Sequence, residues 1–256
     1  MVWFDDLSTC NYWRGDGSSN LIAVGWLSQK KPYAKGAVSR EIQDKLWEFL
    51  RGRPWGEPRV LQYRGCHLCD LCENEKDEHY YSVKSPKGEE ISIGIYNLIV
   101  PDRLNQRLFV SPSTIIHYIV DHNYCPPKEF QEAVQNCPNN DLPEFFEGLE
   151  ELIPKEECWQ EHFYESYGAA LAASNGLSSK RELSLAFQHA YENKSMNALG
   201  SIGKSMNDFS KDAQALIHLI SKNESVKQRA FTQWLETIQR TIETAKSLCE
   251  RPEMEY

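Results

Sequence analysis

The sequence predicts an α+β fold: a small zinc-stapled antiparallel sheet with helices, followed by an all-α helical bundle. Residues 1–155 alternate short strand-like runs, turns and helices, and hold most of the prolines and aromatic residues. Residues 156–256 contain one proline, Pro252, and their pattern is helical almost throughout. Three cysteines crowded into residues 66–72 add a metal site to the first half. We therefore expect an α+β zinc-binding domain over residues 1–155 and a helical domain over residues 156–256.

Strands are predicted where short apolar runs are bounded by turn residues. Leu21–Trp26 is apolar and aromatic enough for a buried strand, and Arg107–Val110 is a further candidate. Tyr80–Lys84 and Glu90–Val100 are expected to pair as a hairpin, because the Pro-Lys-Gly segment at residues 86–88 is typical of a turn.

Helices of the first half are predicted from apolar stripes and capping residues. Val38–Leu50 carries one stripe, with Ser39 as a candidate N-cap. Ser111 at the cap and Pro112 at the first helical position predict a helix that ends near Asn123. Two more helices are expected, Lys128–Gln135 and then Leu142–Ile153 with Asp141 at its cap.

The second half contains four predicted helical segments. The last of them carries an apolar stripe around Trp234 at helical spacing, which we interpret as core between packed helices. The four segments are Cys158–Ser174, Ser179–Asn193, Ser205–Lys222 and Glu224–Cys249.

The charge balance and the lack of targeting segments narrow the classes of protein. The net charge is −9, from 28 basic and 37 acidic residues, which argues against a general nucleic-acid binder and favours a cationic partner. No apolar run approaches the ~20 residues of a membrane helix. The N-terminus lacks the basic and apolar parts of a signal peptide. Because three of the cysteines are clustered as in a metal site, we expect a cytoplasmic protein in a reducing compartment.

The strongest chemical signal is the cysteine knuckle at residues 65–72 (GCHLCDLC). A Cys-x2-Cys turn brings two thiolates to one tetrahedral ion at Zn–S distances near 2.3 Å, and we favour Cys69 and Cys72 over Cys66 for this role. A closed structural site needs four ligands. The others are expected from His67 in the knuckle and from His117 and His122 in the helix after Pro112.

The spacing of the two helical histidines leaves two arrangements open. Five residues subtend about 500° on an ideal helix, so the rings of His117 and His122 would point about 140° apart. Both bind one ion only if the helix tightens or unwinds near Asn123. Otherwise His117 binds and His67 completes the set.

Three segments together resemble a largely uncharacterised bacterial family. They are the GWL segment at residues 25–27, the G-x-H-x-C-x-x-C turn at residues 65–72 and the H-Y-I-x-x-H-x-Y-x-P-P-x-x-F block that ends at Phe130. The resemblance covers about residues 15–135 and implies no reaction. It implies that one set of residues acts together: His67, Cys69, Cys72, His117 and His122.

A catalytic metal site has weaker support in the sequence. Asp70 and Asp121 lie close to the predicted ligands and offer a base for a zinc-dependent hydrolase. The HExxH and zinc-deaminase signatures are absent, however, and two thiolate ligands suppress the Lewis acidity that hydrolysis needs. The sequence therefore favours a non-enzymatic protein.

An acidic segment offers a partner-binding surface. Residues 141–157 contain seven carboxylates and one lysine, and Glu144, Glu147 and Glu151 share one face of the predicted helix. A solvated helix face explains this pattern, and so does a surface that docks on a basic effector.

Three functions follow from these observations. The first is a zinc-stabilised, non-enzymatic bacterial interaction protein, such as an immunity or antitoxin-type inhibitor that binds a toxic effector, or a component of a defence system. The alternatives are a zinc-dependent hydrolase and a nucleic-acid-binding zinc protein, the last of which the negative charge disfavours.

Overall fold

The computed structural model describes residues 3–11, 20–51, 67, 69–72, 82–140, 142–147, 149–153, 157–174, 226–236 and 240. The chain divides into two compact units, one formed by Met1–Arg53 with Glu57–Trp159 and one by Pro54–Gly56 with Gln160–Tyr256. We describe each unit by itself. The expected boundary after residue 155 stays a prediction, because compactness alone does not show that a unit folds independently.

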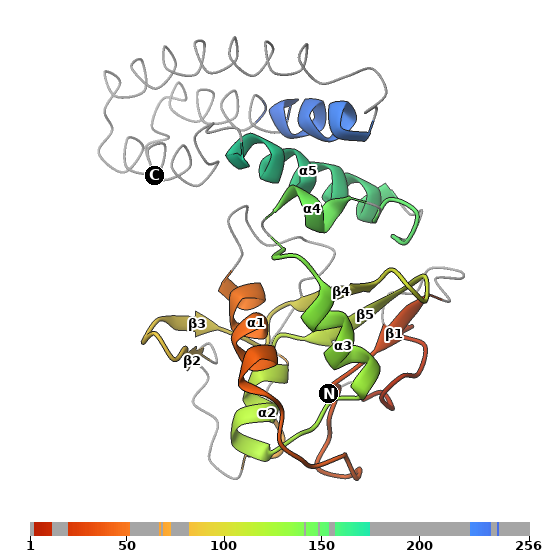
Figure 1. Cartoon of the computed structure of the whole chain (residues 1–256). Coiled ribbons are helices and arrows are strands. Elements are labelled where there is room, and N and C mark those ends of the chain that lie inside the picture. The colour runs from red at the N-terminus through yellow and green to blue at the C-terminus, as the bar shows by residue number, and fades with distance from the viewer. Residues whose placement is uncertain are drawn as a thin grey trace, which may run out of the picture. The chain divides into compact units, whose positions relative to one another are not determined.

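A three-stranded sheet lies in the first unit (Figure 1), in the order β1 (Leu21–Ala23), β5 (Arg107–Pro112), β4 (Asn97–Asp102). β4 and β5 are antiparallel neighbours, whereas β1 runs parallel to β5. The mixed α+β class is confirmed, but this sheet is not purely antiparallel as predicted. The long connection between β1 and β5 removes the hairpin constraint that would force antiparallel pairing.

The predicted hairpin is present as a separate two-stranded sheet. β2 (Ser82–Lys84) pairs antiparallel with β3 (Glu90–Ser92). The predicted single strand Glu90–Val100 is wrong, because it breaks at Gly94 between β3 and β4. Gly94 has φ +80°, and a Cβ there would lie 2.8 Å from the His67 carbonyl oxygen. Only glycine fits this bend, which seats the chain against the cysteine knuckle.

The helix that bears two predicted ligands starts later than the sequence indicates. Ser111 and Pro112 belong to β5, where they pair with Leu98 and Asn97 of β4. Strand pairing therefore takes the residues expected to cap the helix. Helix α2 covers Ile115–His122.

Two further helices of the first unit pack against each other. α1 (Arg40–Arg51) begins two residues later than the predicted Val38, directly after the predicted cap Ser39, whose Oγ accepts the Ile42 N–H at 3.3 Å. α3 (Lys128–Asn136) packs on β4 and on α1 (Figure 1). The residues that these helices bury are the apolar ones at helical spacing: Ile42, Leu46, Trp47, Phe49, Leu50, Phe130, Ala133 and Val134.

The predicted helix Leu142–Ile153 is wrong beyond its first turn. α4 covers only Pro143–Phe146, and Glu147 ends it with an extended backbone at ψ 123°. The following apolar residues Leu149, Leu152 and Ile153 are buried through turns instead. Burying apolar side chains does not require continuous helix.

The Asp102 carboxylate holds the turn between β4 and β5. It accepts hydrogen bonds from Asn105 Nδ2 and from Arg107 Nε, both at 2.8 Å. Burial by itself raises the pKa of Asp102, but these partners outweigh it, and the pKa lies below its ordinary value.

We expect Asp102→Asn to lower the free energy of unfolding by about 1–3 kcal/mol at neutral pH. The pKa of Asp102 is lower in the folded chain than in the unfolded chain, where it is near 4. Its stabilisation is therefore present above that value and is lost as the pH falls through the folded pKa. The thermal midpoints of wild type and variant should differ at neutral pH and converge in acid. A gap that persists at about pH 2 would contradict this account, and the exposed Asp44→Asn serves as the control.

The second unit contains most of α5 (Glu157–Ser174), which matches a predicted helix, and helical residues 226–236. Ala230, Phe231, Trp234 and Leu235 are buried there, as the apolar stripe predicts. The predicted helices Ser179–Asn193 and Ser205–Lys222 lie outside the described residues, as does most of the last segment after residue 236. None of the helices in the described part of the chain is long and apolar enough to cross a membrane.

Candidate metal centre

The cysteine knuckle supplies two thiols. Cys69 and Cys72 are both half-buried. The Asp70 carboxylate fastens the turn between them, because it accepts hydrogen bonds from Ser28 Oγ and from the Gln29 N–H, each at 3.1 Å. Burial raises the pKa of Cys69 to about 12, so this thiol needs a nearby cation to become a thiolate at neutral pH.

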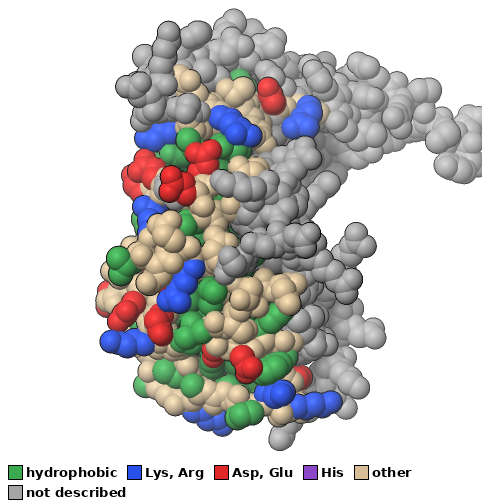
Figure 2. All heavy atoms as spheres, turned by 90° about the vertical axis from the view of Figure 1, so that its right-hand side faces the viewer, with side chains coloured by type: hydrophobic (Ala, Val, Ile, Leu, Met, Phe, Trp, Pro, Cys, Tyr) green, Lys and Arg blue, Asp and Glu red, His purple; other side chains and the backbone are tan. Residues whose placement is uncertain are grey.

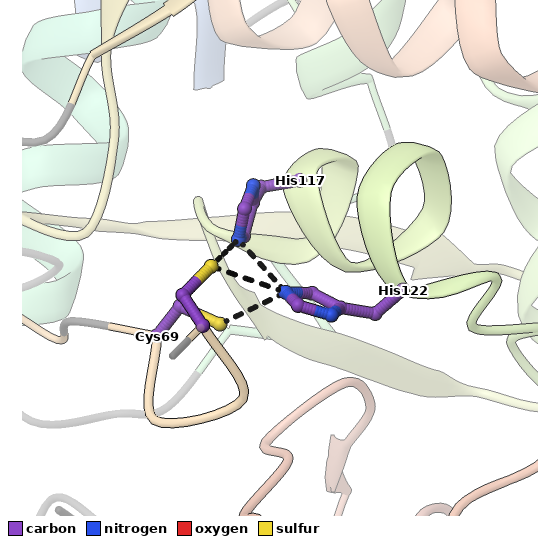
Figure 3. A group of neighbouring side chains, drawn as sticks. Cys69, His117 and His122 are labelled. Atoms are coloured by element: carbon purple, nitrogen blue, oxygen red, sulfur yellow. Dashed lines mark hydrogen bonds between the residues drawn. The ribbon is translucent and has the colours of Figure 1, made fainter. Parts of the chain in front are cut away.

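Helix α2 supplies two imidazoles from its last turn and a half (Figure 3). His122 is the final helical residue, and Asn123 follows in the left-handed conformation at φ 54°. The Tyr124 N–H donates to the Tyr118 carbonyl oxygen at 3.0 Å, as in a helix C-terminal motif. The helix therefore ends at Asn123, the point at which the sequence required a change in the helix if His117 and His122 were to bind one ion. His117 and His122 point to one place, with their Nε2 atoms 3.2 Å apart.

The four side chains already approximate a tetrahedral ligand set. All four donor atoms lie within 4.8 Å of one another. Cys72 Sγ lies 3.3 Å from His117 Nε2, and Cys69 Sγ lies 3.3 Å from His122 Nε2. Zinc–ligand bond lengths in a regular tetrahedron imply N···N separations of about 3.3 Å and S···N separations of about 3.6 Å. The cluster of Cys69, Cys72, His117 and His122 can therefore hold one metal ion.

Asp121 orients one of the imidazoles. Its Oδ2 lies 2.6 Å from His117 Nδ1, one helical turn away. A proton on Nδ1 leaves Nε2 free to bind a metal. Burial lowers the pKa of His117, and the Asp121 charge opposes that shift. The spacing of four residues on one helix face is a signal that sequence reasoning missed, since Asp121 was considered only as a catalytic base.

We expect Asp121→Asn to weaken metal binding about 10- to 100-fold, because it removes the charge that favours this tautomer and ring orientation. Competition against a chromogenic zinc chelator measures the affinity, and ring NMR of His117 reports the tautomer. The matched control is Asp44→Asn, a similarly exposed carboxylate on α1. Equal affinities in both variants and in wild type would refute the orienting role.

His67 is the predicted ligand that the structure leaves outside the cluster. Its buried ring lies edge-on to Trp26 at 5.5 Å, and its Nε2 lies 3.4 Å from Tyr118 Oη. Burial lowers the pKa of His67 to about 4, so the ring is neutral near pH 7. The His67 N–H donates to the Gly94 carbonyl oxygen at 2.5 Å. His67 thus packs the knuckle against the fold. The lesser candidate Cys66 lies outside the described residues.

The three predicted partner-binding residues are exposed but do not share a helix face. Glu144 lies in α4, Glu147 follows its end, and Glu151 lies in a turn. The backbone between them is not a continuous helix, so the expected i, i+3, i+7 alignment is wrong. Their exposure above buried Phe145 and Leu149 still gives an acidic surface.

The fold and the site together define an α+β domain with a Cys2His2 cluster that could hold a metal ion. Residues 2–135 match the family described as a domain of unknown function (DUF7919), and the chain belongs to this family. The match covers just over half of the chain and includes all four cluster residues. This match covers a residue range as a whole and does not test the individual motifs on which the resemblance in the sequence rests. Comparison with curated proteins and with solved structures finds no match.

Proposed function

We propose that Cys69, Cys72, His117 and His122 hold a structural Zn²⁺ and that the chain is a zinc-stabilised, non-enzymatic interaction protein. The observation that carries the proposal is the cluster itself, in which two sulfur and two nitrogen ligands stand close to tetrahedral spacing. This ligand set suits zinc, and four protein ligands leave no open position for a substrate or water. Thiolate ligands also favour a reducing compartment, which supports the cytoplasm.

The nearby carboxylates support a structural role as well. A hydrolytic site needs a base free to accept a proton from water. Asp70 is hydrogen-bonded to Ser28 and Gln29, and Asp121 to His117. Each carboxylate therefore has hydrogen bonds that position another part of the site, Asp70 the knuckle and Asp121 the His117 ring.

The class of partner that we propose is a basic effector, which this protein would neutralise by direct binding, as an immunity or antitoxin-type inhibitor or a defence component does. Net charge −9 and the exposed Glu144, Glu147 and Glu151 support it. Complementary charge accelerates association and positions the partners.

Co-expression with the product of the adjacent gene tests the role. We expect a complex that protects the cell, with association that slows markedly as salt rises. The triple change Glu144→Lys, Glu147→Lys, Glu151→Lys should weaken the complex at unchanged zinc content. The control is the equal charge change Glu41→Lys, Asp44→Lys, Glu129→Lys at other exposed positions. No complex and no protection, together with a hydrolytic activity that Asp121→Asn abolishes, would favour the zinc-hydrolase alternative.

We further propose that the second unit is an all-α helical bundle. Gly168 of α5 supports this, because a Cβ there would collide with the Ala230 carbonyl oxygen and lie 2.5 Å from Trp234 Cβ. Arg229 also donates to Tyr164 Oη at 3.1 Å. These contacts describe two helices in close approach.

The direction of the stability change caused by one substitution, Gly168→Ala, tests this packing. Helix propensity alone predicts that Gly168→Ala stabilises by about 1 kcal/mol. Close packing predicts a loss of about 1–3 kcal/mol instead, which we expect in urea unfolding followed by Trp fluorescence. A gain in stability would contradict the close approach, and release of residues 160–256 by protease as an unfolded fragment would contradict the bundle.

A further inference from the structure

A second charged surface lies beside the metal centre, and it is basic. We call residues Ser28–Gly36 the basic loop. They lie within residues 27–40, which contain four cationic residues and no carboxylate, although the whole chain has a net charge of −9. Lys30, Lys31 and Lys35 are all exposed. Figure 2 shows Lys and Arg side chains at several places on the described surface, some of them at its lower end, the end at which Figure 1 draws this loop.

Aromatic rings lie among these cations. Lys31 Nζ lies 4.4 Å from the centroid of the Trp3 ring, and Lys35 Nζ lies 5.3 Å from that of Tyr33. Both rings are half-buried, so part of each remains accessible. The surface therefore offers positive charge and aromatic faces side by side.

Both elements that carry the metal ligands hold the basic loop in place. The knuckle does so through Asp70, which accepts hydrogen bonds from Ser28 Oγ and the Gln29 N–H. The end of α2 does so through the Asn123 carbonyl oxygen, which accepts the Gly36 N–H at 3.0 Å. A loop fixed at both ends loses less conformational entropy when a ligand binds.

We propose that the basic loop binds single-stranded nucleic acid, with Lys30, Lys31 and Lys35 on phosphates and the rings of Trp3 and Tyr33 against bases. Single strands expose base faces that stack on aromatic side chains, while lysines track the backbone. An acidic protein would use the lysines but would gain little from the rings. The proposal goes beyond the partner-binding role above and does not require it.

Fluorescence anisotropy with labelled oligothymidine and oligouridine of about 12 nucleotides tests the proposal on the full chain in its purified, metal-loaded form. We expect saturable binding with a dissociation constant on the order of 10⁻⁵ M at low salt. The slope of log K against log salt should be about −2, because three cations each release about 0.7 counterions from a single strand. Zinc content is measured on the same samples, so a failure of the zinc proposal is seen separately.

Matched variants separate the basic loop from general charge. Changing Lys30, Lys31 and Lys35 to Ala should weaken binding at least about 10-fold and flatten the salt slope. Changing Lys84, Lys87 and Lys128, which are exposed elsewhere, to Ala should have little effect. Trp3→Leu, which keeps apolar bulk, should weaken oligonucleotide binding but leave any polyglutamate binding unchanged.

Three results would overturn the proposal. They are no saturable binding, equal losses in the two triple variants, and polyglutamate competing as well as an oligonucleotide while Trp3→Leu has no effect. The last result would assign the basic loop to an acidic protein partner instead.

Discussion

Removal of the proposed zinc ion is expected to unfold much of the first unit, at a cost on the order of 5 kcal/mol in unfolding free energy. Among the described residues, the knuckle is also anchored by the Asp70 hydrogen bonds, by the hydrogen bond from the His67 N–H to the Gly94 carbonyl oxygen and by the packing of the His67 ring. An ion bound by all four side chains would replace the hydrogen-bond contact between His117 Nε2 and His122 Nε2 with stronger metal–ligand bonds. Purified protein should contain one equivalent of zinc, and a strong chelator should lower the thermal midpoint sharply.

Single substitutions make the same test without a chelator. Cys72→Ser should reproduce most of the loss and yield aggregating protein, because it removes one of the four ligands. Cys125→Ser changes another half-buried thiol outside the cluster and should retain both zinc and stability. Elemental analysis showing under about 0.2 metal equivalents in wild type would refute a resident structural ion.

Trp26→Ala is expected to cost about 3–5 kcal/mol, a large share of the stability of a typical domain. Trp26 has no exposed surface, and its Nε1–H donates to the Val110 carbonyl oxygen at 3.0 Å. Its ring also contacts Phe4 edge-on at 5.2 Å and the buried ring of His67 at 5.5 Å. Truncation would leave a cavity beneath the knuckle and would remove one of the hydrogen bonds that the Val110 carbonyl oxygen accepts, while the one from the Val24 N–H at 3.1 Å stays.

A graded series checks this assignment. Trp26→Phe keeps most of the apolar contact but loses the hydrogen bond, so we expect a smaller loss of about 1–3 kcal/mol. Leu104→Ala, at a side chain that is 91% exposed, should change stability by less than about 0.5 kcal/mol. Chemical unfolding measures all three. A loss in Trp26→Ala no larger than in Leu104→Ala would contradict the buried role of the indole.

The sequence by itself predicted the elements whose signals are local. The stripe and Ser39 cap of α1, the apolar face of α3 and the β2–β3 hairpin depend on residues close in the chain, and the structure has all of them. The thiols of Cys69 and Cys72 were also predictable, because a Cys-x2-Cys turn brings its two ligands together unaided.

Tertiary structure alone decided the features that depend on distant partners. Ser111 and Pro112 lie in strand β5 because they pair with β4. The parallel pairing of β1 with β5 joins segments that are far apart in sequence. Whether His67 or His122 joins the cluster also depended on residues distant in the sequence. Asn123 ends α2 so that His122 turns to the thiols, while Trp26 and Tyr118 surround His67 in the core. Local propensities state what a segment favours, but packing between segments selects among nearly equal alternatives, because burial and pairing outweigh those preferences.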